Sequence, residues 1–507
     1  MRDKLLIGCD IGTSGTKTVA MDVGGNILAH ASCSYGIITL KNQWAEQWPD
    51  VWLNAALKTI TEVAAQVTPE CIAGICISAL YGGTGVLCND KMQPVRPTII
   101  WMDRRAEEES KWISNQIGKN VIFDVSKNGI DSYYGYTKLL WVQQNEPDLW
   151  KKIRMILPIH SYIVYKLTGK LSVDYCSAGN VGGIYDYEKH GWSDLMLGKL
   201  NIGADILPKQ FFTPSDIVGG LNAEFSKQMG LLEGIPVCAG TVDCIAAMLS
   251  TAAVKEGDNA AILGTSLNWG FIHSRMPSNP NLISMPYCIE PTRLSYTYGG
   301  ASTAGALPRW FLNNFLQNES ADTYSQIEKE IIDQGIPAGS DGLIVLPYFM
   351  GERTPIWDVN ASGMILGLSL RHTKAHIFKA ILESTAYSLK HIIDTMTEGV
   401  DVERIVLVGG GAKSDLWKSI FADVTGLPVY SPQKAIEAPL GDAFLAGIGT
   451  GLLKDFCEIK NWIGFNAPVE PNIGNYEKYQ RYFEVYKDLY PKLKNDMRAL
   501  KELSLSY

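Results

Sequence analysis

Hydrophobic and polar positions alternate along the first part of the chain in a way that predicts strands. KLLIGCD, TKTVAMD and GNILAHA each have the pattern of a β-strand, and Gly24-Gly25-Asn26 predicts a hairpin turn. WPDVWLNAALKTITEVAAQV has helical periodicity, with Pro49 and Asp50 at its start. AGICISA is the next expected strand, and the apolar run from Ile72 to Cys88 is expected to form two buried strands around a turn.

The second half of the chain repeats this pattern. NAAILGTSLNWGFI, from Asn259, predicts a strand, a Gly-Thr-Ser turn and another strand. ERIVLVGGGAKSDLWKSIFADVTG predicts a buried strand over Ile405 to Val408, a glycine turn, and a helix that begins near Ser414. Near the C-terminus, NYEKYQRYFEVYKDLYPKL places aromatic and aliphatic residues at helical spacing, which predicts an amphipathic helix packed on the body of the protein.

Two of these turns have the composition of anion-binding loops. Asp10 to Lys17, DIGTSGTK, is a tight Gly/Ser/Thr loop between two strands, and such a loop leaves backbone N–H groups free to point at an anion. The strand, glycine turn and helix around GGGAKSD place amides and a helix N-terminus beside a ligand. The turn is not GxGxxG, so it does not indicate a Rossmann dinucleotide site.

Length and composition narrow the class of protein. A chain of 507 residues is long enough for two or three domains. The net charge of 45 − 53 = −8, without any basic run, gives no support for nucleic-acid binding. The N-terminus is not a signal peptide, and no apolar run is long enough to span a membrane. Ten cysteines without a CxxC pair favour reduced thiols in the cytoplasm and do not favour a zinc site.

One carboxylate stands out in an apolar setting. In AGTVDCIAAML, Asp243 begins a small apolar helix, and Cys244 to Leu249 carry no charge. Asp243 is a candidate helix cap, because Asp near a first turn accepts backbone N–H groups. It is equally a candidate surface charge, or a reacting group on the floor of a cleft, and this stretch alone does not decide among the three.

A series of motifs resembles the FGGY carbohydrate kinases, within the actin, Hsp70 and hexokinase superfamily. GMILGLSLRHTKAHIFKAILE, Gly363 to Glu383, is similar to the family's C-terminal signature over its whole length. DIGTSGTK and LGTS resemble the two phosphate loops, and GGGAKSDLW with EAPLGDAFLAG resembles the adenosine-site turn and the helix after it. GERTPIWD, NQWAEQWPDVW, IIWMDRRA, YTKLLWVQQNEPDLW, SYIVYKLTG and AGTVDC complete the series, in the family's order. The chain looks most like xylulokinases and their relatives.

This resemblance implies a fold and an activity. It implies an α/β protein of two ribonuclease-H-like domains, as in actin and hexokinase, with a cleft between them. We expect residues 1–246 to form a sugar-binding domain and residues 247–507 an ATP-binding domain. The implied activity is transfer of phosphate from ATP, with Mg²⁺, to a small sugar or polyol. No nucleic-acid or membrane partner is expected, and assembly as a homodimer is left open.

The resemblance also assigns roles to residues around the first phosphate loop. Asp243 would be the general base facing the sugar hydroxyl, and its cap role is compatible with this. Asp10, and with it Asp243, would face the Mg²⁺, with Asp10 acting through water because magnesium takes few carboxylates. Asp10 is otherwise a cap at a strand end, and Lys17 is otherwise only a solvated charge. The residues expected to approach the transferring phosphate are Gly12, Thr13, Ser14, Gly15 and Lys17.

The second phosphate loop and the adenosine site are assigned in the same way. Gly264, Thr265 and Ser266 would bind phosphate, although a plain hairpin turn is the alternative. Gly305 would line the same site. Glycines let the backbone approach a flat ring or a ribose closely, so the adenosine contacts are expected to be Gly410, Gly411, Ala412 and Ser414.

On the sugar side, the chain departs from the xylulokinase pattern. Asp103 is expected to bond substrate hydroxyls, and Arg104 and Arg105 beside it have Glu107 to Glu109 as alternative partners. Xylulokinases typically have Gln-Met-His-Gly after the strand at 73–78, whereas this chain has Ala-Leu-Tyr81-Gly82-Gly. The Arg-Glu pair of glycerol kinases is also missing there. Tyr81 and Gly82 are therefore expected to set a substrate choice that differs from D-xylulose.

Three classes of function follow from these observations. The first is an ATP-dependent kinase acting on a primary hydroxyl of D-xylulose, another pentulose, or a substrate such as erythritol, glycerol or gluconate. The second is a non-catalytic sugar or nucleotide sensor on the same fold. The third is a chaperone-type nucleotide hydrolase. Because the chain keeps Asp10, Asp243 and both phosphate loops, it favours the kinase.

Overall fold

The computed structural model describes residues 4–318, 320–397, 399–434 and 437–505. The chain forms two compact units. The first consists of Met1–Glu256, Ile272–Thr297 and Ile436–Gly464, and the second of Gly257–Phe271, Tyr298–Ala435 and Phe465–Tyr507. Segments from the second half of the sequence thus complete the first unit. The expected division of the chain after residue 246 stays a prediction.

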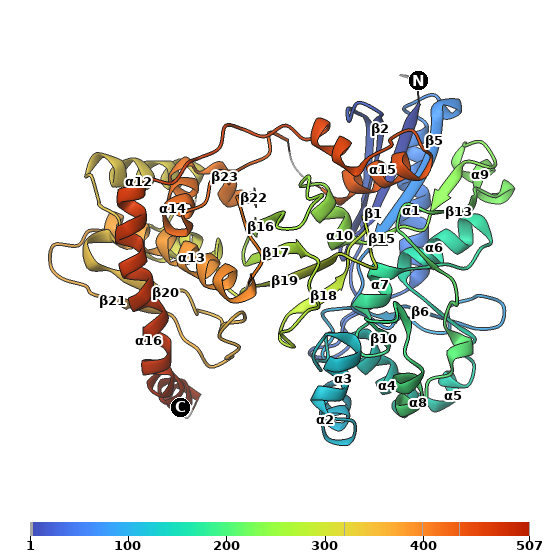
Figure 1. Cartoon of the computed structure of the whole chain (residues 1–507), viewed down its shortest axis with the longest axis horizontal. Coiled ribbons are helices and arrows are strands. Elements are labelled where there is room, and N and C mark those ends of the chain that lie inside the picture. The colour runs from blue at the N-terminus through green and yellow to red at the C-terminus, as the bar shows by residue number, and fades with distance from the viewer. Residues whose placement is uncertain (1–3, 319, 398, 435–436, 506–507) are drawn as a thin grey trace. The chain divides into compact units, whose positions relative to one another are not determined.

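The first unit is built on a mixed sheet (Figure 1). The strand order is β13-β14-β5-β1-β2-β3, and β15 also pairs with β5. The pairs β1–β2 and β2–β3 are antiparallel, whereas β5 runs parallel to β1, β14 and β15. The strands are β1 (Leu5–Ile11), β2 (Gly15–Asp22), β3 (Ile27–Ser34), β5 (Ile72–Ala79), β13 (Ile217–Gly220), β14 (Pro236–Cys238) and β15 (Thr241–Val242).

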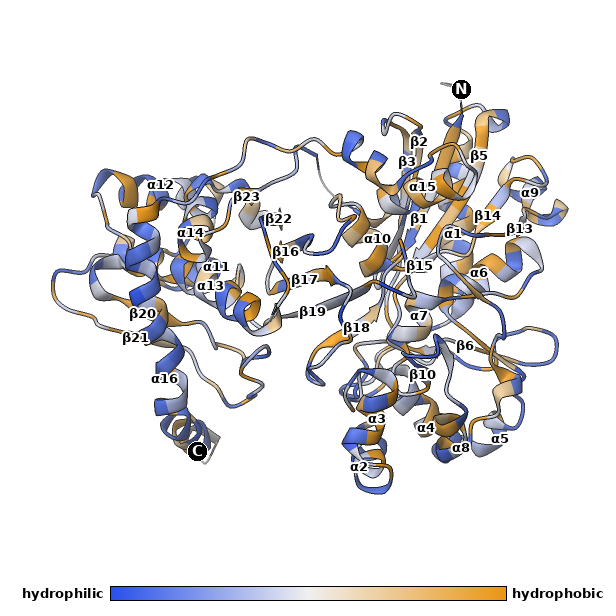
Figure 2. Ribbon diagram, viewed as in Figure 1, coloured by the Kyte–Doolittle hydropathy of each residue, from blue (hydrophilic) through white to orange (hydrophobic). Residues whose placement is uncertain are grey.

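Several helices pack close to this sheet, among them α1 (Pro49–Ala64), α15 (Ala438–Gly449) and α10 (Asp243–Leu249). Helix α1 contacts β2 and β3 and buries an apolar face that includes Trp52, Ile60 and Val63. Helix α15 contacts β1 and β5, and α10 packs against α15. A methyl group at Gly441 would lie 2.1 Å from the carbonyl oxygen of Ala246, so only glycine permits this close approach of α10 and α15. Figure 2 shows α10 and β5 mostly in hydrophobic colours, as expected for buried elements.

The first unit also contains smaller α-helices and strands, all of which except the strand Glu46–Gln47 follow β5 in the sequence. Helix α4 begins at Gly135, directly after a loop that contains Tyr133, and α7 is capped at its N-terminus by Asp174, which accepts the N–H of Ser177. The helices are α2 (Glu107–Gln116), α3 (Lys119–Ser126), α4 (Gly135–Asn145), α5 (Pro147–Trp150), α6 (Ile159–Thr168), α7 (Tyr175–Asn180), α8 (Asp194–Leu200) and α9 (Ala223–Met229). The short strands are β4 (Glu46–Gln47), β6 (Val86–Cys88), β7 (Thr98–Ile99), β8 (Met155–Leu157), β9 (Val173–Asp174), β10 (Tyr185–Asp186), β11 (Gly191–Trp192), β12 (Phe211–Phe212) and β18 (Ile283–Pro286).

The second unit has its own sheet, with the order β19-β17-β16-β22-β23. Its long helix α13 begins after Thr373, which forms a capping box with His376. The strands are β16 (Asn259–Leu263), β17 (Leu267–His273), β19 (Ser295–Ala301), β20 (Ile344–Leu346), β21 (Met364–Leu366), β22 (Ile405–Gly409) and β23 (Val429–Tyr430). The helices are α11 (Ala306–Phe311), α12 (Ala321–Asp333), α13 (Lys374–Met396), α14 (Asp415–Thr425) and α16 (Ile473–Leu505).

The elements predicted from hydrophobic patterning are confirmed. The hairpin turn is present, with Gly25 at φ 81° and its N–H donating to the carbonyl of Asp22. The run from Ile72 to Cys88 forms β5 and β6, and the C-terminal aromatic pattern lies on α16, where Tyr479, Phe483 and Tyr486 are buried. All ten cysteines are free thiols. Among the described helices, none combines the length and the apolar character needed to cross a membrane.

Candidate active site

Three parallel strands of the first unit end at the same level. Ala79 of β5 pairs with Ile11 of β1 on one side and with Val242 of β15 on the other. The loop 12–15 follows β1, the turn 80–83 follows β5, and Asp243 follows β15. In α/β sheets, ligands bind at the carboxyl ends of the parallel strands. The register therefore gathers the predicted phosphate loop, sugar-side turn and base at one edge of one sheet.

Asp243 is the first residue of α10 and is partly buried. The N-cap position is Val242, and the Asp243 carboxylate accepts the N–H of Cys244 at 2.6 Å. Burial raises the pKa of Asp243 to about 6, although this N–H and the nearby His160 act in the opposite direction. The carboxylate thus satisfies one helix amide, as the cap alternative expected, and its partial burial is not that of a freely solvated surface charge.

Asp10 and Asp442 lie near this carboxylate. Burial, and then repulsion by Asp243, raise the pKa of Asp10 to about 8. The Ser78 hydroxyl lies 2.7 Å from Asp442 Oδ2 and 3.3 Å from Asp10 Oδ1, so it links the two acids. Asp442, on α15, is fully buried, and its pKa is raised well above the usual range by burial and by Asp10. We did not predict Asp442 from the sequence, although a charge inside the apolar run APLGDAFLAG is an available signal.

Asp10 and Asp243 fit a divalent cation nearby. Burial disfavours the negative charge of both groups, and repulsion by Asp243 adds to this at Asp10, so a nearby cation would relieve both effects. Across the described part of the chain, no three His, Cys, Asp or Glu side chains are arranged to hold a metal ion by themselves. The residues present therefore fit Mg²⁺ that takes most of its ligands from phosphate and water.

The loop at 12–15 is a closed turn. The N–H of Gly12 donates to the carbonyl of Gly15 at 2.9 Å, and the Tyr35 hydroxyl donates to the carbonyl of Gly12 at 2.7 Å. The Trp101 indole N–H donates to Thr13 Oγ1 at 3.0 Å, which joins the loop to the sugar-side segment. Lys17 forms a half-exposed ion pair with Glu437 at 2.8 Å. Its role toward phosphate stays a prediction.

Gly82 lies between two aromatic side chains. It has φ 76°, and a methyl group there would lie 2.8 Å from Tyr133 Cζ and 3.0 Å from Trp101 Cβ. The phenol of Tyr133 therefore occupies the space into which a side chain at position 82 would project. The Tyr133 hydroxyl accepts from Asn180 Nδ2 at 3.4 Å. Tyr133 was missed in the sequence, because nothing in DSYYGYTKLLW distinguishes it from the buried tyrosines beside it.

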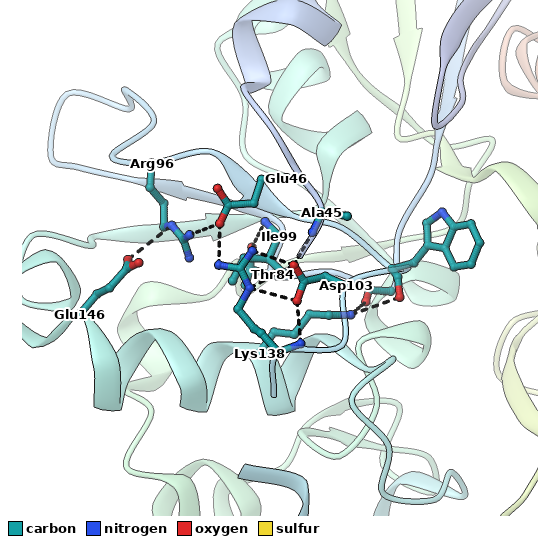
Figure 3. Close-up of polar contacts among 11 residues, drawn as sticks. Ala45, Glu46, Thr84, Arg96, Ile99, Asp103, Lys138 and Glu146 are labelled. Carbon is teal, nitrogen blue, oxygen red and sulfur yellow. Dashed lines mark hydrogen bonds and ion pairs between the residues drawn. The ribbon is translucent and has the colours of Figure 1, made fainter. Parts of the chain in front are cut away.

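The other two predicted sugar-side residues are buried. Tyr81 is 6% exposed, and burial raises its pKa. Asp103 is fully buried, and its carboxylate accepts from Ala45 N at 2.6 Å and from Arg105 Nη2 at 2.6 Å (Figure 3). Arg105 also pairs with Glu46, rather than with the acidic residues that follow it in sequence. Substrate contacts by Tyr81 and Asp103 stay predictions.

In the second unit, the predicted nucleotide residues belong to three segments that adjoin one another. Gly264 N donates to the carbonyl of Ser266 at 3.0 Å, and Gly305 N donates to the carbonyl of Gly264 at 2.9 Å, so the two segments lie together. Gly409 pairs with Leu263 in the sheet, which places the turn at Gly410, Gly411 and Ala412 beside the same strand end. Ser414 is the N-cap of α14 and accepts the N–H of Trp417 at 2.9 Å.

Glu352 supports this part of the second unit. It is 5% exposed, and its Oε1 accepts the N–H groups of Ser302 and Arg353, each at 2.7 Å. Ser302 precedes the segment 304–306, whose amides donate to the loop at Gly264 and Thr265. Burial raises the pKa of Glu352 to about 7, above its ordinary value of 4.5.

This shift predicts a pH-dependent stability. Between the two pKa values the folded state holds a proton that the unfolded state has released, so the free energy of unfolding falls as pH rises through this window. The fall attributable to Glu352 is at most about 3 kcal/mol. In urea unfolding, we expect the free energy of unfolding of Glu352→Gln, minus that of wild type, to be more positive at about pH 8 than at about pH 5. The same difference at both pH values would contradict this. Glu233→Gln, at an exposed position, is the control and should show no such change.

The chain is similar to known proteins over nearly its whole length. Residues 5–250 match the N-terminal domain of the FGGY family of carbohydrate kinases, and residues 259–450 match its C-terminal domain. The chain is 30% identical to a xylulose kinase of Bacillus subtilis, over 98% of this chain and 99% of the relative. It is 27% identical to a gluconokinase of the same organism, over 97% and 96%. The crystal structure of xylulose kinase from Rhodospirillum rubrum has a TM-score of 0.90 at 25% identity, over 97% and 100%. The chain therefore belongs to the FGGY family of carbohydrate kinases and is a xylulokinase-like sugar kinase with a two-domain α/β fold.

Proposed function

We propose that the enzyme transfers the terminal phosphate of ATP to a primary hydroxyl of a small ketose or polyol. The observation that supports this most directly is the common edge of β1, β5 and β15, which carries the loop 12–15, Gly82 and Asp243 together. We also propose that the enzyme acts in the cytoplasm, because its cysteines are free thiols, which suit reducing conditions. The chain keeps the reacting carboxylates and both phosphate loops, which favours a kinase over a sensor.

Asp243 acts as the base in this proposal. Its carboxylate orients the acceptor hydroxyl and takes its proton as the bond to phosphorus forms, while positioning supplies most of the rate in phosphoryl transfer. The raised pKa makes Asp243 a better proton acceptor than an exposed aspartate. Mg²⁺, held by Asp10 and the nucleotide, would neutralise charge on the phosphates. Gly264, Thr265, Ser266 and Gly305 would bind the phosphates, with the turn at 410–412 against adenosine.

The acceptor side points to a substrate other than D-xylulose. The aromatic wall made by Trp101 and Tyr133 closes the space at Gly82, where xylulokinases typically carry a histidine. Trp101 is 37% exposed, and its indole N–H reaches Thr13 of the phosphate loop. An acceptor hydroxyl would therefore meet the phenol of Tyr133 here, where it would meet the imidazole of a histidine in a typical xylulokinase. A site that hydrogen-bonds a substrate hydroxyl rejects an analogue lacking it by about 10⁴-fold, so this exchange is enough to change the preferred substrate.

A coupled ADP-release screen tests the proposal. The purified enzyme, with Mg-ATP, is offered D-xylulose, other ketoses, tetritols, pentitols, glycerol and gluconate. We expect acceptor-dependent ADP release, with the highest kcat/KM on a compound that differs from D-xylulose in a carbon or a stereocentre. A clear preference for D-xylulose would contradict the substrate part alone. ATP turnover that no acceptor increases would contradict the kinase proposal itself.

A further inference from the structure

A buried lysine lies behind the acceptor side of the site. Lys138, on α4, is 0% exposed, which is rare for a lysine. Its Nζ donates to the carbonyl oxygens of Gly82 at 2.7 Å and Tyr133 at 2.5 Å, and lies 3.5 Å from that of Trp101. An ammonium group has three donors and no acceptor, so it matches three converging carbonyl groups.

These three carbonyl groups come from separate segments of the chain. Gly82 belongs to the turn after β5, Trp101 to the segment after β7, and Tyr133 to the loop before α4. They are also the three residues that meet at the acceptor side, where Tyr133 and Trp101 lie against Gly82. Lys138 is therefore the one side chain in the described hydrogen-bond network that joins the backbones of all three.

The surroundings fix Lys138 in place, although burial disfavours its charge. Burial lowers the pKa of Lys138 well below its usual range, and the negative charge of Asp103 opposes this shift. Arg104 and Arg105 add repulsion, and Asp131 adds attraction. Asp103 itself accepts the N–H of Ala45 (Figure 3). It also pairs with Arg105, whose guanidinium lies 3.7 Å from the centre of the Trp44 ring. Asp103, which we predicted as a sugar ligand, thus also lies near Lys138 and favours its positive charge.

We propose that Lys138 is a positioning residue for phosphoryl transfer, whose Nζ holds the backbones of Gly82, Trp101 and Tyr133 in the arrangement that receives the acceptor. This inference rests on the proposed function in one respect, because it takes these three residues as the acceptor wall. Lys138 does not itself reach the acceptor, since its donors are used by backbone carbonyl groups. It acts through the geometry of the wall.

Lys138→Met tests this, because methionine has a similar length and no donors. We expect the KM for the acceptor found in the screen to rise at least about tenfold, with the KM for ATP changed less than about twofold, because only the acceptor wall is loosened. Lys138→Gln keeps two donors on a shorter chain, so its effect should be intermediate, and it carries the test if the methionine variant does not fold. Equal changes in both KM values, or no change in either, would overturn the proposal.

Lys379 offers a matched control in the second unit. It is 7% exposed, and its Nζ donates to the carbonyl oxygens of Ile336 at 2.6 Å and Pro337 at 2.9 Å. Lys379→Met removes the same kind of contact, so it should lower stability and leave the KM for the acceptor unchanged. If it raised that KM as much as Lys138→Met, the effect would be general destabilisation and the proposal would be wrong.

Hydrogen exchange without any acceptor separates this inference from the proposed substrate class. In Lys138→Met we expect faster amide exchange in segments 80–85, 99–103 and 131–135 than in wild type, with Lys379→Met unchanged there. This arm decides the anchoring role even if the screen yields no acceptor, which would contradict the proposed function alone. Unchanged exchange in all three segments would overturn the role of Lys138.

Discussion

Replacing Asp243 by asparagine is expected to lower kcat by about 10²–10⁴, the usual contribution of a positioned general base. Asparagine keeps the shape of the side chain and still accepts the N–H of Cys244, so α10 should begin at the same residue. What is lost is the proton acceptor. We therefore expect Asp243→Asn to fold, and to bind ATP and the acceptor with dissociation constants within about threefold of wild type. Rapid-quench turnover and calorimetric binding measure the two quantities separately.

A control separates catalysis from the loss of a helix-terminal charge. Asp194 is an exposed acidic residue in the first turn of α8, so Asp194→Asn removes a carboxylate from a comparable position away from the sheet edge. It should leave kcat unchanged. Near-normal turnover in Asp243→Asn would show that this carboxylate is only a cap. Its position at the end of β15 would then have no catalytic meaning.

The loops at the sheet edge could be predicted from the sequence because each is a short motif directly after a strand. DIGTSGTK, the turn after AGICISA, and AGTVDC each follow an apolar strand, and parallel strands bring their carboxyl ends together. The resemblance supplied the order of these motifs, and the register of Ile11, Ala79 and Val242 brings the three segments together. Helix α15 was predicted as a helix. Its place in the first unit, with Asp442 beside Ser78, depends on contacts between residues more than 360 apart in the sequence, which no local pattern encodes.

The acceptor side was harder to predict because it depends on which side chain fills which space. The missing histidine at Gly82 is visible in the sequence, but the ring that fills its place belongs to Tyr133, in another loop. The ion pair of Asp103 was also not predicted. Its carboxylate accepts from Arg105, two residues later, whereas the sequence offered Glu107 to Glu109 as partners for that arginine. Nothing in YTKLLWV distinguishes Lys138 from an ordinary helix lysine, because the three backbone carbonyl groups around its Nζ belong to other segments of the chain.

Gly82→Ala is expected to lower kcat/KM for the acceptor by about 100-fold, which corresponds to about 2.7 kcal/mol. Two effects contribute. A non-glycine residue at φ 76° is strained, typically by about 1–2 kcal/mol. The added methyl group would also overlap the Tyr133 ring and the Trp101 Cβ, and overpacking costs about 1–3 kcal/mol. Both effects displace the aromatic wall, whereas the residues of the second unit that we propose to bind nucleotide are untouched, so the KM for ATP should not change.

Two further variants divide this loss into its parts. Gly169 has φ 72°, and a methyl group added there would have nothing within 4 Å, so Gly169→Ala measures the backbone strain alone and should leave acceptor kinetics unchanged. In a Tyr133→Ala background the ring is absent. Adding Gly82→Ala there should reduce kcat/KM for the acceptor less than it does in wild type, by a difference of at least about 1 kcal/mol in activation free energy. Additive effects would mean that Tyr133 does not fill the space at Gly82. The substrate preference would then have to come from other residues, and the proposed departure from D-xylulose would lose its structural basis.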